Sequence, residues 1–502
     1  MAQWTWDRFA ATARLRGEAI ALRQGDAAIT FAELCDLAET LSASIAIAPG
    51  ERAVVCAENS IPVAATILAI WRRGGVPVLV NSRAPESHVR HALDKSGAQV
   101  GFADEGIAPL DPRLRLFPAA ADSARGSGSP EHGRAGTAAG SIVFTSGSTG
   151  LPKGVVQPAA NLIDGAERVA RLMGYGDRDV ILCPVPFAFD YGWGQFLSMA
   201  MCGIPLVLPK EPNGFALCAA IAHHRPTVLA SVPSVLSDLL LGLAPIAETD
   251  CSSIRLITNT GSKIPAPVLD QVHVHFPDAD LSLNYGLTET YRSSSLPFAL
   301  ARTRPNSIGR PIEGVEIRIL REDGTVADVG EVGELCHLGA GVFAGYWEEP
   351  VLTDAVRQEF PAANGGTVMG VRTGDYGFFD AEGLLYLEGR RDRLVKCMGI
   401  RVSLAEIEDM LYRTGLLHEA AVVAVDHDIF GSFIAAHIVP APGKAAEGDK
   451  ALVKAVRKAV RDVMSNYMQP RQYSVYSSLP KTGSGKFDLA RLKQMTADSL
   501  QP

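Results

Sequence analysis

The chain has no long hydrophobic run, no surplus of positive charge and no apolar leader. Its longest apolar runs, residues 61–71 and 196–209, are shorter than the ~18–20 residues that a membrane-spanning helix requires. Asp and Glu number 55 against 47 for Lys and Arg, so the net charge of −8 disfavours nucleic-acid and anionic-membrane binding. The N-terminal residues carry Asp7 and Arg8 in place of an apolar signal core. These absences predict a protein with no membrane span, no nucleic-acid partner and no export signal.

Cysteine pairs are also lacking. The eight cysteines are scattered through the sequence, without a CxxC pair or a Cys/His cluster. Reduced thiols in the cytoplasm are the simplest interpretation of this pattern, which disfavours a structural zinc site. No internal repeat or coiled-coil pattern is present, so the oligomeric state stays open.

The sequence contains instead an alternation of short apolar strands and amphipathic helices, which predicts a layered α/β fold of several domains or subdomains. Beyond residue 310 the pattern becomes strand-rich, with Gly and Asp turns. The last ~110 residues have the pattern of a separate small α/β unit, in which Ser403 and Glu406 form a capping box for a helix. Residues 120–140 are rich in Gly, Ser and Ala, which favours a flexible surface loop.

The densest chemical signal is the segment TSGSTGLPKG at residues 145–154, which follows an apolar strand. Its glycines let exposed backbone N–H groups approach an anion, its hydroxyls add donors, and its lysine adds a positive charge. We expect a phosphate-binding loop made by Thr145, Ser146, Gly147, Ser148, Thr149, Gly150 and Lys153.

The spacing of this loop excludes a Walker A motif. The other lysine-bearing loop, residues 480–486, also fails, because Pro480 stands where the first glycine should be and Phe487 replaces the metal-binding hydroxyl. No GxGxxG follows an early strand, which weakens a nicotinamide dehydrogenase interpretation.

The loop resembles the signature of the AMP-forming adenylating superfamily, which includes acyl-CoA and aryl-CoA synthetases, peptide-synthetase adenylation domains and luciferases. Further motifs of that superfamily recur in order along essentially the whole chain. They are NYGLTE at 284–289, GEL at 333–335, GYW at 345–347, RTGD at 372–375, GRRD at 389–392 leading to Lys396, Gly399 and Arg401, and KTGSGK at 481–486.

The resemblance implies a large N-terminal domain, residues 1–391, of layered α/β subdomains plus a distorted β-barrel. It also implies a small mobile α+β C-terminal domain, residues 392–502, with a hinge at Asp392. The implied activity is ATP-dependent conversion of a small or medium carboxylic acid, acyl or amino acid, to an acyl adenylate with release of pyrophosphate. A pantetheine thiol of CoA or of a carrier protein, supplied in trans, would then take the acyl group.

The resemblance also implies the roles of individual residues in binding ATP and Mg²⁺. Tyr285 would pack against adenine, Asp375 would accept both ribose hydroxyls with help from Arg390, and Asn284 and Gly286 belong to the same nucleotide motif. Thr288 would contact the α-phosphate and Glu289 would ligate Mg²⁺. Lys486 would be the principal catalytic residue, because its ammonium would bridge the carboxylate and the α-phosphate as charge develops.

The acid pocket is less constrained by sequence. Asp190 lies in FDYGWGQ at 189–195 and matches the aspartate that pairs with the substrate's α-amino group in many amino-acid-activating domains. The same segment, taken together with residues 285–293, also resembles acyl-CoA ligases whose acids carry no amine. Both interpretations of Asp190 stay open. The bulky residues Tyr191 and Trp193 either line the pocket or pack in the core, and Lys263 either binds a second carboxylate or points to solvent. The expected pocket residues are Asp190, Tyr191, Trp193, Gly261, Ser262, Lys263 and Ser293.

Two other function classes are compatible with the resemblance. One is a luciferase-like oxygenase that oxidises the adenylate, which no feature of the sequence demands. The other is a non-catalytic nucleotide- or acyl-binding regulator, against which the presence of Lys153, Glu289, Asp375 and Lys486 argues.

Overall fold

The computed structural model describes residues 5–117, 139–145, 152–390, 393–397, 400–427, 431–444, 448–461, 464, 468–482 and 486–500. Of the predicted site residues, Ser146, Gly147, Ser148, Thr149, Gly150 and Asp392 lie outside these ranges, as does most of the stretch 120–140. None of the helices in the described ranges combines the length and apolar character that crossing a membrane requires.

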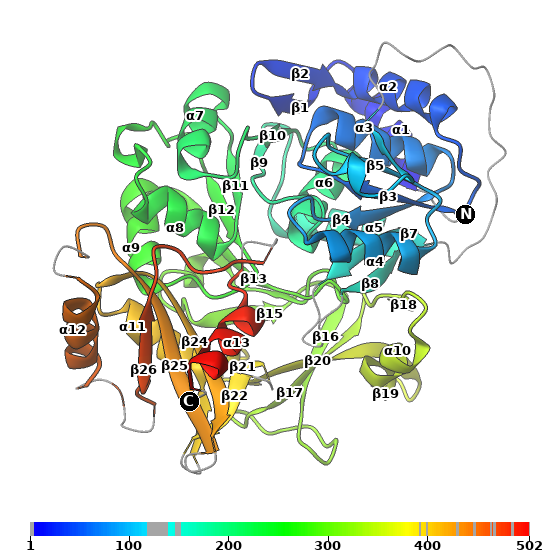
Figure 1. Ribbon diagram of the computed structural model, residues 1–502. Coiled ribbons are helices and arrows are strands. Elements are labelled where there is room, and N and C mark those ends of the chain that lie inside the picture. The colour runs from blue at the N-terminus through cyan, green and yellow to red at the C-terminus, as the bar shows by residue number, and fades with distance from the viewer. Residues whose placement is uncertain are drawn as a thin grey trace.

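The largest sheet has fourteen strands and changes from parallel to antiparallel along its width (Figure 1). Its parallel part has the order β13-β12-β11-β9-β10-β1, and β2 pairs antiparallel with β1 at the edge. Strands such as β12 are buried along their whole length, as expected of a parallel strand covered on both faces. These strands are β1 (Ile20–Gln24), β2 (Ala27–Thr30), β9 (Ile181–Leu182), β10 (Leu206–Leu208), β11 (Val228–Ser231), β12 (Leu256–Asn259) and β13 (Asp280–Tyr285).

The strand-rich pattern predicted beyond residue 310 forms the antiparallel part of the same sheet. It continues from β13 in the order β14-β15-β21-β20-β17-β16, with β19 paired to β20. The strands are β14 (Ser294–Ser295), β15 (Ser307–Pro311), β16 (Val315–Leu320), β17 (Gly333–Gly339), β19 (Arg357–Pro361), β20 (Thr367–Phe379) and β21 (Leu385–Arg390). The pairing of β20 with β21 sets Asp375 opposite Arg390.

A second sheet of seven strands has the order β18-β8-β7-β4-β3-β5-β6. Strands β3 to β7 are parallel neighbours, whereas β8 returns antiparallel to β7 and sets Lys153 opposite Thr145. The strands are β3 (Arg52–Cys56), β4 (Val76–Val80), β5 (Val100–Ala103), β6 (Leu114–Leu116), β7 (Ala139–Thr145), β8 (Lys153–Pro158) and β18 (Gly345–Tyr346).

Helices separate and cover the two sheets. One large apolar core joins residues of both sheets to the inner helices α1 (Thr5–Arg16), α2 (Phe31–Ser44), α3 (Ile61–Arg72), α5 (Ala159–Leu172) and α6 (Asp190–Cys202). The other face of the large sheet carries α7 (Gly214–His224), α8 (Pro233–Leu241) and α9 (Ala266–His275), and that of the second sheet carries α4 (Glu86–Ser96). The short helix α10 (Pro350–Val356) lies beside β18 and β19. The predicted layered α/β class is confirmed.

The C-terminal part builds apolar cores of its own. Two clusters draw their buried residues only from positions 402–492, around a three-stranded sheet and its helices. The elements are β22 (Leu394–Cys397), β23 (Ile400–Ser403), α11 (Leu404–Tyr412), β24 (Leu417–His427), β25 (Gly431–Pro440), α12 (Asp449–Arg461), β26 (Gln472–Val475) and α13 (Leu489–Leu500). In Figure 1 this part lies against the lower side of the parallel strands, near α9.

This topology gathers polar side chains at one edge of the large sheet. Asp190 follows β9, Gly261 follows β12 and Tyr285 ends β13. Because the carboxyl ends of neighbouring parallel strands meet at one edge, residues far apart in sequence come together there. That edge is the region to which α11 and the C-terminal part are apposed.

Candidate active site

A cavity of about 470 Å³ contains three of the predicted nucleotide-binding residues, Lys153, Glu289 and Arg390. They come from the start of β8, from the loop after β13 and from the end of β21. The remaining lining residues include Gly374, Thr373 and Arg372 of β20 and Tyr346 of β18. The cavity therefore brings two cations and a carboxylate of the predicted set to one concave surface.

Tyr285 and Asp375 form a buried pair next to this cavity. The Tyr285 hydroxyl donates to Asp375 Oδ2 at 2.6 Å, and Arg390 Nε lies 3.6 Å from Asp375 Oδ1. Burial and the neighbouring carboxylate of Asp375 raise the pKa of Tyr285 well above its usual value, so the phenol stays protonated. The Tyr285 ring packs among apolar residues of the antiparallel strands, and its hydroxyl positions the carboxylate expected to bind ribose.

Glu289, the predicted Mg²⁺ ligand, is positioned by β18. Tyr346 donates its hydroxyl to Glu289 Oε1 at 2.7 Å, and the ammonium of Lys153 lies 5.4 Å from the centroid of the Tyr346 ring. Burial raises the pKa of Tyr346, so it acts here as a donor. The neighbouring residue Thr288 is held through its carbonyl oxygen, which accepts from Gln157 Nε2 at 2.7 Å.

The end of the Lys486 side chain lies in the same region, although the residue as a whole is exposed. A methyl group built on Gly261 would stand 3.5 Å from Lys486 Cε and 4.0 Å from Nζ. Desolvation lowers the pKa of Lys486 and Arg390 lowers it further, whereas Asp375 and Asp190 raise it. Lys486 therefore interacts both with the nucleotide-side residues and with the predicted acid pocket.

Gly261 is required at its position by its backbone and by Lys486. Its φ is +92°, a value that side-chain-bearing residues rarely adopt, and the lysine passes directly over it. The carbonyl oxygen of the following Ser262 accepts from Asn259 Nδ2 at 3.2 Å, which pins the turn. Both residues lie on the loop between β12 and α9.

Lys263, on the same loop, requires a correction. It was expected to bind a second carboxylate or to point to solvent, but it forms an ion pair with Asp409 of α11. The Lys263 charge is thus matched by the C-terminal part, because α9 and α11 are in contact in this arrangement.

Asp190 and Tyr191, two of the predicted acid-binding residues, begin α6. Burial raises the pKa of Asp190 to about 7, against the opposing effects of Arg292 and Lys486. Tyr191 is buried, donates its hydroxyl to the carbonyl oxygen of Thr258 at 3.0 Å and presents its ring face to Arg292. One turn further, Trp193 is 1% exposed and stacks on Phe196.

Three predicted binding residues are engaged elsewhere. Trp193 is in the core, in agreement with the packing alternative left open by the sequence. The Asn284 amide donates to the carbonyl oxygens of Asn259 and Ser282, so it ties β13 to β12 and is not free for nucleotide. Ser293 is fully buried and its hydroxyl bonds His337 Nδ1 at 2.9 Å, where burial lowers the histidine pKa to about 4. A side chain at Gly286 would strike the Tyr291 carbonyl oxygen, so this glycine has a backbone role.

Arg292 was missed by sequence reasoning. It is 7% exposed, and its guanidinium carbon lies 5.6 Å from the centroid of the Tyr191 ring. The sequence signal was an arginine three residues after Glu289, but one sequence does not reveal that this charge is buried beside Asp190.

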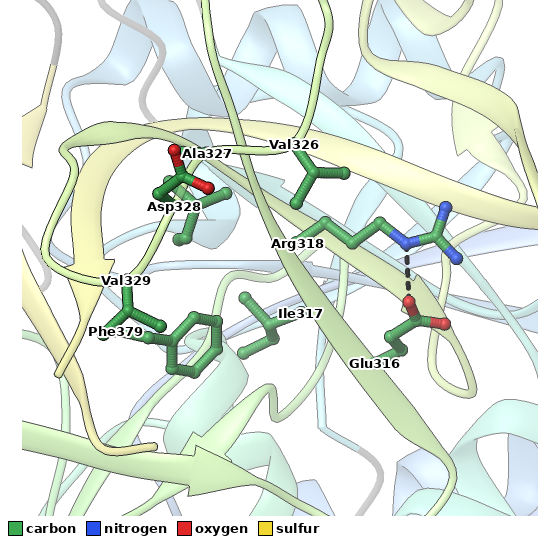
Figure 2. Close-up of a pocket in the computed structure, with 9 residues that line it drawn as sticks. Glu316, Ile317, Arg318, Val326, Ala327, Asp328, Val329 and Phe379 are labelled. Atoms are coloured by element: carbon green, nitrogen blue, oxygen red, sulfur yellow. Dashed lines mark hydrogen bonds and ion pairs between the residues drawn. The ribbon is translucent and has the colours of Figure 1, made fainter. Parts of the chain in front are cut away.

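A smaller cavity of about 270 Å³ lies away from this region, between β16 and the residues before β17 (Figure 2). Its wall is mainly apolar, and its charged pair, Arg318 and Glu316, is joined by a 2.5 Å hydrogen bond. None of the predicted site residues lines it, so the larger cavity is the candidate active site.

Comparison with known families identifies the family of the chain. Residues 9–347 match the model of the AMP-binding enzyme family, and residues 406–486 match that of the AMP-binding enzyme C-terminal domain. The chain belongs to the AMP-binding enzyme family. The family predicted from the ordered motifs is confirmed, and so is the mixed fold with a large N-terminal and a smaller C-terminal part.

This AMP-binding enzyme is similar to two kinds of curated protein. It is 27% identical to tyrocidine synthase 3 of Brevibacillus parabrevis, over 93% of this chain and 7% of that protein. It spans 7–13% of the length of this and several other peptide synthetases. It is 28% identical to the 4-hydroxybenzoate–CoA/benzoate–CoA ligase of Rhodopseudomonas palustris, over 97% of this chain and 92% of that enzyme.

A solved structure has the same fold. The o-succinylbenzoate CoA synthetase of Bacillus subtilis, solved with its acyl-adenylate intermediate, superimposes with a TM-score of 0.84 at 25% identity and 98% coverage of both chains. The same synthetase has also been solved with ATP and a magnesium ion.

The residues of this AMP-binding enzyme fit a magnesium nucleotide. Lys153 and Arg390 supply positive charge on the cavity wall, Glu289 supplies a carboxylate oxygen, and Asp375 supplies an acceptor held by Tyr285. Carboxylate and phosphate oxygens are the ligands that Mg²⁺ prefers. These cations and carboxylates therefore match both the nucleotide and the magnesium ion.

Proposed function

We propose that the chain is an ATP-dependent acid–thiol ligase. It converts a small or medium carboxylic acid and ATP to an acyl adenylate and pyrophosphate, and then transfers the acyl group to the thiol of coenzyme A with release of AMP. The observation that carries the proposal is the position of Lys486, whose charged end interacts with Asp375 and Arg390 on one side and with Asp190 on the other. A cation at that junction neutralises both reacting anions.

The first step joins two anions, so its catalysis consists mainly of charge neutralisation and positioning. Lys153 and the hydroxyl-rich loop that precedes it hold the departing phosphates, and Asp375 with Tyr285 and Arg390 holds the ribose. Mg²⁺ on Glu289 neutralises phosphate charge when bound. Lys486 stabilises the charge that develops between the carboxylate oxygen and the α-phosphorus.

We also propose that residues 392–502 form the mobile unit that carries Lys486, with Asp392 as its hinge. The support is that the apolar clusters of this part contain no buried residue from before position 402. Rotation of the unit would withdraw Lys486 after adenylation and let the thiol approach.

Coenzyme A is the proposed acceptor. The curated ligase that is matched over nearly its whole length makes a CoA thioester, whereas the peptide synthetases are matched over a small fraction of theirs. A carrier protein acting in trans is the alternative acceptor. With either acceptor, we propose that the enzyme acts in the cytoplasm.

The test is acid-dependent exchange of labelled pyrophosphate into ATP over a panel of carboxylic acids. Exchange with at least one acid, followed by thioester formation on addition of CoA, supports the proposal. No exchange with any acid, in a preparation that binds ATP, contradicts it and favours a nucleotide-binding regulator. Exchange without a thioester from CoA shifts the acceptor to a carrier protein.

A further inference from the structure

Arg292 is a buried cation for which the described part of the chain supplies no ion-pair partner. Its Nη1 is inaccessible and makes no hydrogen bond, and within the described ranges no carboxylate oxygen lies within 4.0 Å of its guanidinium. The Arg292 guanidinium lies over the face of the Tyr191 ring. A cation–π contact offsets only part of the cost of burying a charge, so this guanidinium needs a counter-charge from elsewhere.

Asp190 is the nearest candidate for that counter-charge, but it does not pair with Arg292. The two groups interact electrostatically across the pocket, since Arg292 lowers the pKa of Asp190, yet no ion pair or hydrogen bond joins them at 4.0 Å or less. Desolvation outweighs the arginine and leaves the Asp190 carboxyl partly protonated near neutral pH. The two side chains are therefore within electrostatic reach of each other but are not paired.

The backbone holds Arg292 in this position under strain. Tyr291 has a φ of +61°, which is unusual for an aromatic residue, and it is itself buried with a hydroxyl that makes no hydrogen bond. The strained turn allows Tyr291, Arg292 and Ser293 to be buried consecutively, with Ser293 anchored on His337. Such strain persists where the surrounding structure imposes it, and it is concentrated at binding sites.

Asp190 and Arg292 lie close to the proposed adenylation centre. Besides Arg292, the charged groups that act on Asp190 are Glu289 and Lys486, which the proposed function assigns to Mg²⁺ and to the reacting carboxylate. The Asp190 carboxyl is thus within electrostatic reach of both Arg292 and Lys486, which connects Arg292 to the proposed site of the reacting acid.

We propose that Arg292 binds a second carboxylate of the acid substrate, so that the enzyme activates a dicarboxylic acid at one end and holds it at the other. The inference rests on the proposed function and names its substrate class. The planar guanidinium matches a carboxylate with two parallel hydrogen bonds, which a monocarboxylic acid cannot supply. The protonated form of Asp190 donates to the same carboxylate, and the Tyr191 ring forms the wall beneath the guanidinium.

An amino acid is the competing substrate class, because its ammonium would pair with Asp190. It would place a second cation beside an arginine that already lacks an anion, and would leave the buried guanidinium unmatched. The observations on Arg292 therefore favour the dicarboxylic acid, and the amino acid becomes an outcome of the test.

The experiment measures pyrophosphate exchange with succinic, glutaric, adipic, phthalic and isophthalic acids, each paired with its own monomethyl ester. Each pair differs by one charge and little in size. We expect the preferred diacid to exceed its ester by about 100-fold in kcat/KM, because the ester leaves the buried guanidinium unpaired. Amino acids and simple monoacids complete the panel.

Arg292→Gln should bring the ratio of diacid to ester close to one while leaving the KM for ATP within about twofold, and Arg292→Lys should keep part of the preference. Arg171→Gln, which removes an exposed arginine paired with Glu313, is the matched control and should keep the wild-type ratio. The wild-type comparison does not depend on whether a variant folds.

The outcomes separate the two proposals. If esters, monoacids or amino acids exchange as well as the diacids, or if Arg292→Gln retains the diacid preference, the inference about Arg292 is wrong while the ligase function stands. If no acid of any kind supports exchange, the ligase function fails and the inference fails with it.

Discussion

At the scale of single residues, the pair of Tyr285 and Asp375 makes a direct prediction. Tyr285→Phe removes a 2.6 Å hydrogen bond to a buried carboxylate that keeps Arg390 as a partner. We expect the free energy of unfolding to fall by about 1 kcal/mol and the KM for ATP to rise several-fold with a smaller change in kcat, because the carboxylate loses its orientation. Thermal denaturation and exchange kinetics measure both.

The matched control for this change is Tyr473→Phe in β26. The Tyr473 ring contacts Arg457, and no hydrogen bond of its hydroxyl is found among the described residues. If both variants raise the KM for ATP equally, the Tyr285 hydroxyl does not position Asp375.

The pH dependence of acid activation distinguishes the two roles of Asp190. With a pKa raised to about 7 by burial, Asp190 is mostly neutral near pH 6 and mostly ionised near pH 8. A substrate carboxylate at Arg292 is repelled by the ionised form, so kcat/KM for a diacid should fall about tenfold over that interval. An ammonium substrate would give the opposite slope.

Asp190→Asn should remove the fall of kcat/KM for a diacid between about pH 6 and pH 8. The groups facing Asp190 are Arg292, Glu289 and Lys486, and the pKa of Lys486 is lowered by desolvation. A loss of activity due to Lys486 deprotonation would persist in Asp190→Asn, so the variant separates the two titrations. An unchanged slope in Asp190→Asn contradicts the role given to the carboxyl.

Motifs pointed to a set of side chains that lie near one another in the structure, and their catalytic roles stay predictions. Lys153, Glu289, Asp375, Arg390 and Lys486 were all chosen from sequence, and the structure brings them to one region. Partners between distant segments were not predictable, because they depend on how elements dock. The pairing of Lys263 with Asp409 and the burial of Arg292 are both of this kind.

At the scale of elements, the loop between β12 and α9 carries the clearest prediction. Gly261→Ala introduces a side chain at a φ of +92° and places it 3.5 Å from Lys486 Cε. We expect pyrophosphate exchange to fall by about 10- to 100-fold, because small displacements of a catalytic group are costly. Gly174→Ala is the control: its φ is also positive, at +61°, but the added methyl meets no atom within 4 Å. Equal losses in both variants would mean that backbone strain alone is responsible.

Periodicity predicted the type of the elements. The strand-rich pattern expected beyond residue 310 is present as the antiparallel part of the large sheet. Of the capping box at Ser403, the bond from the Glu406 N–H to Ser403 Oγ is present, at 3.4 Å. Ser403 Oγ in turn donates to the carbonyl oxygen of Glu388. That second bond joins α11 to β21, a tertiary contact that local sequence does not encode.

At the scale of the whole molecule, the sequence predicted two parts but not the surface by which they meet. The alternation of apolar segments is sufficient to predict the layers, since each strand and helix must bury its apolar face. At this surface α9 contacts α11, and no periodicity in a single sequence indicates that contact. Lys263 and Asp409 form an ion pair across it.

This ion pair should bias the molecule toward the arrangement in which Lys486 is in place. Lys263→Ala removes a partly exposed pair worth up to about 1 kcal/mol, so we expect pyrophosphate exchange to fall about two- to fivefold. Formation of the thioester from a supplied acyl adenylate and CoA should be unchanged or faster, because that step requires Lys486 to leave. Arg304→Ala removes an ion pair with Glu382 within the N-terminal part, in which the cation is as exposed as Lys263, and it should change neither step. If Lys263→Ala slows both steps equally, the pair contributes to stability and does not select between two arrangements of the C-terminal part.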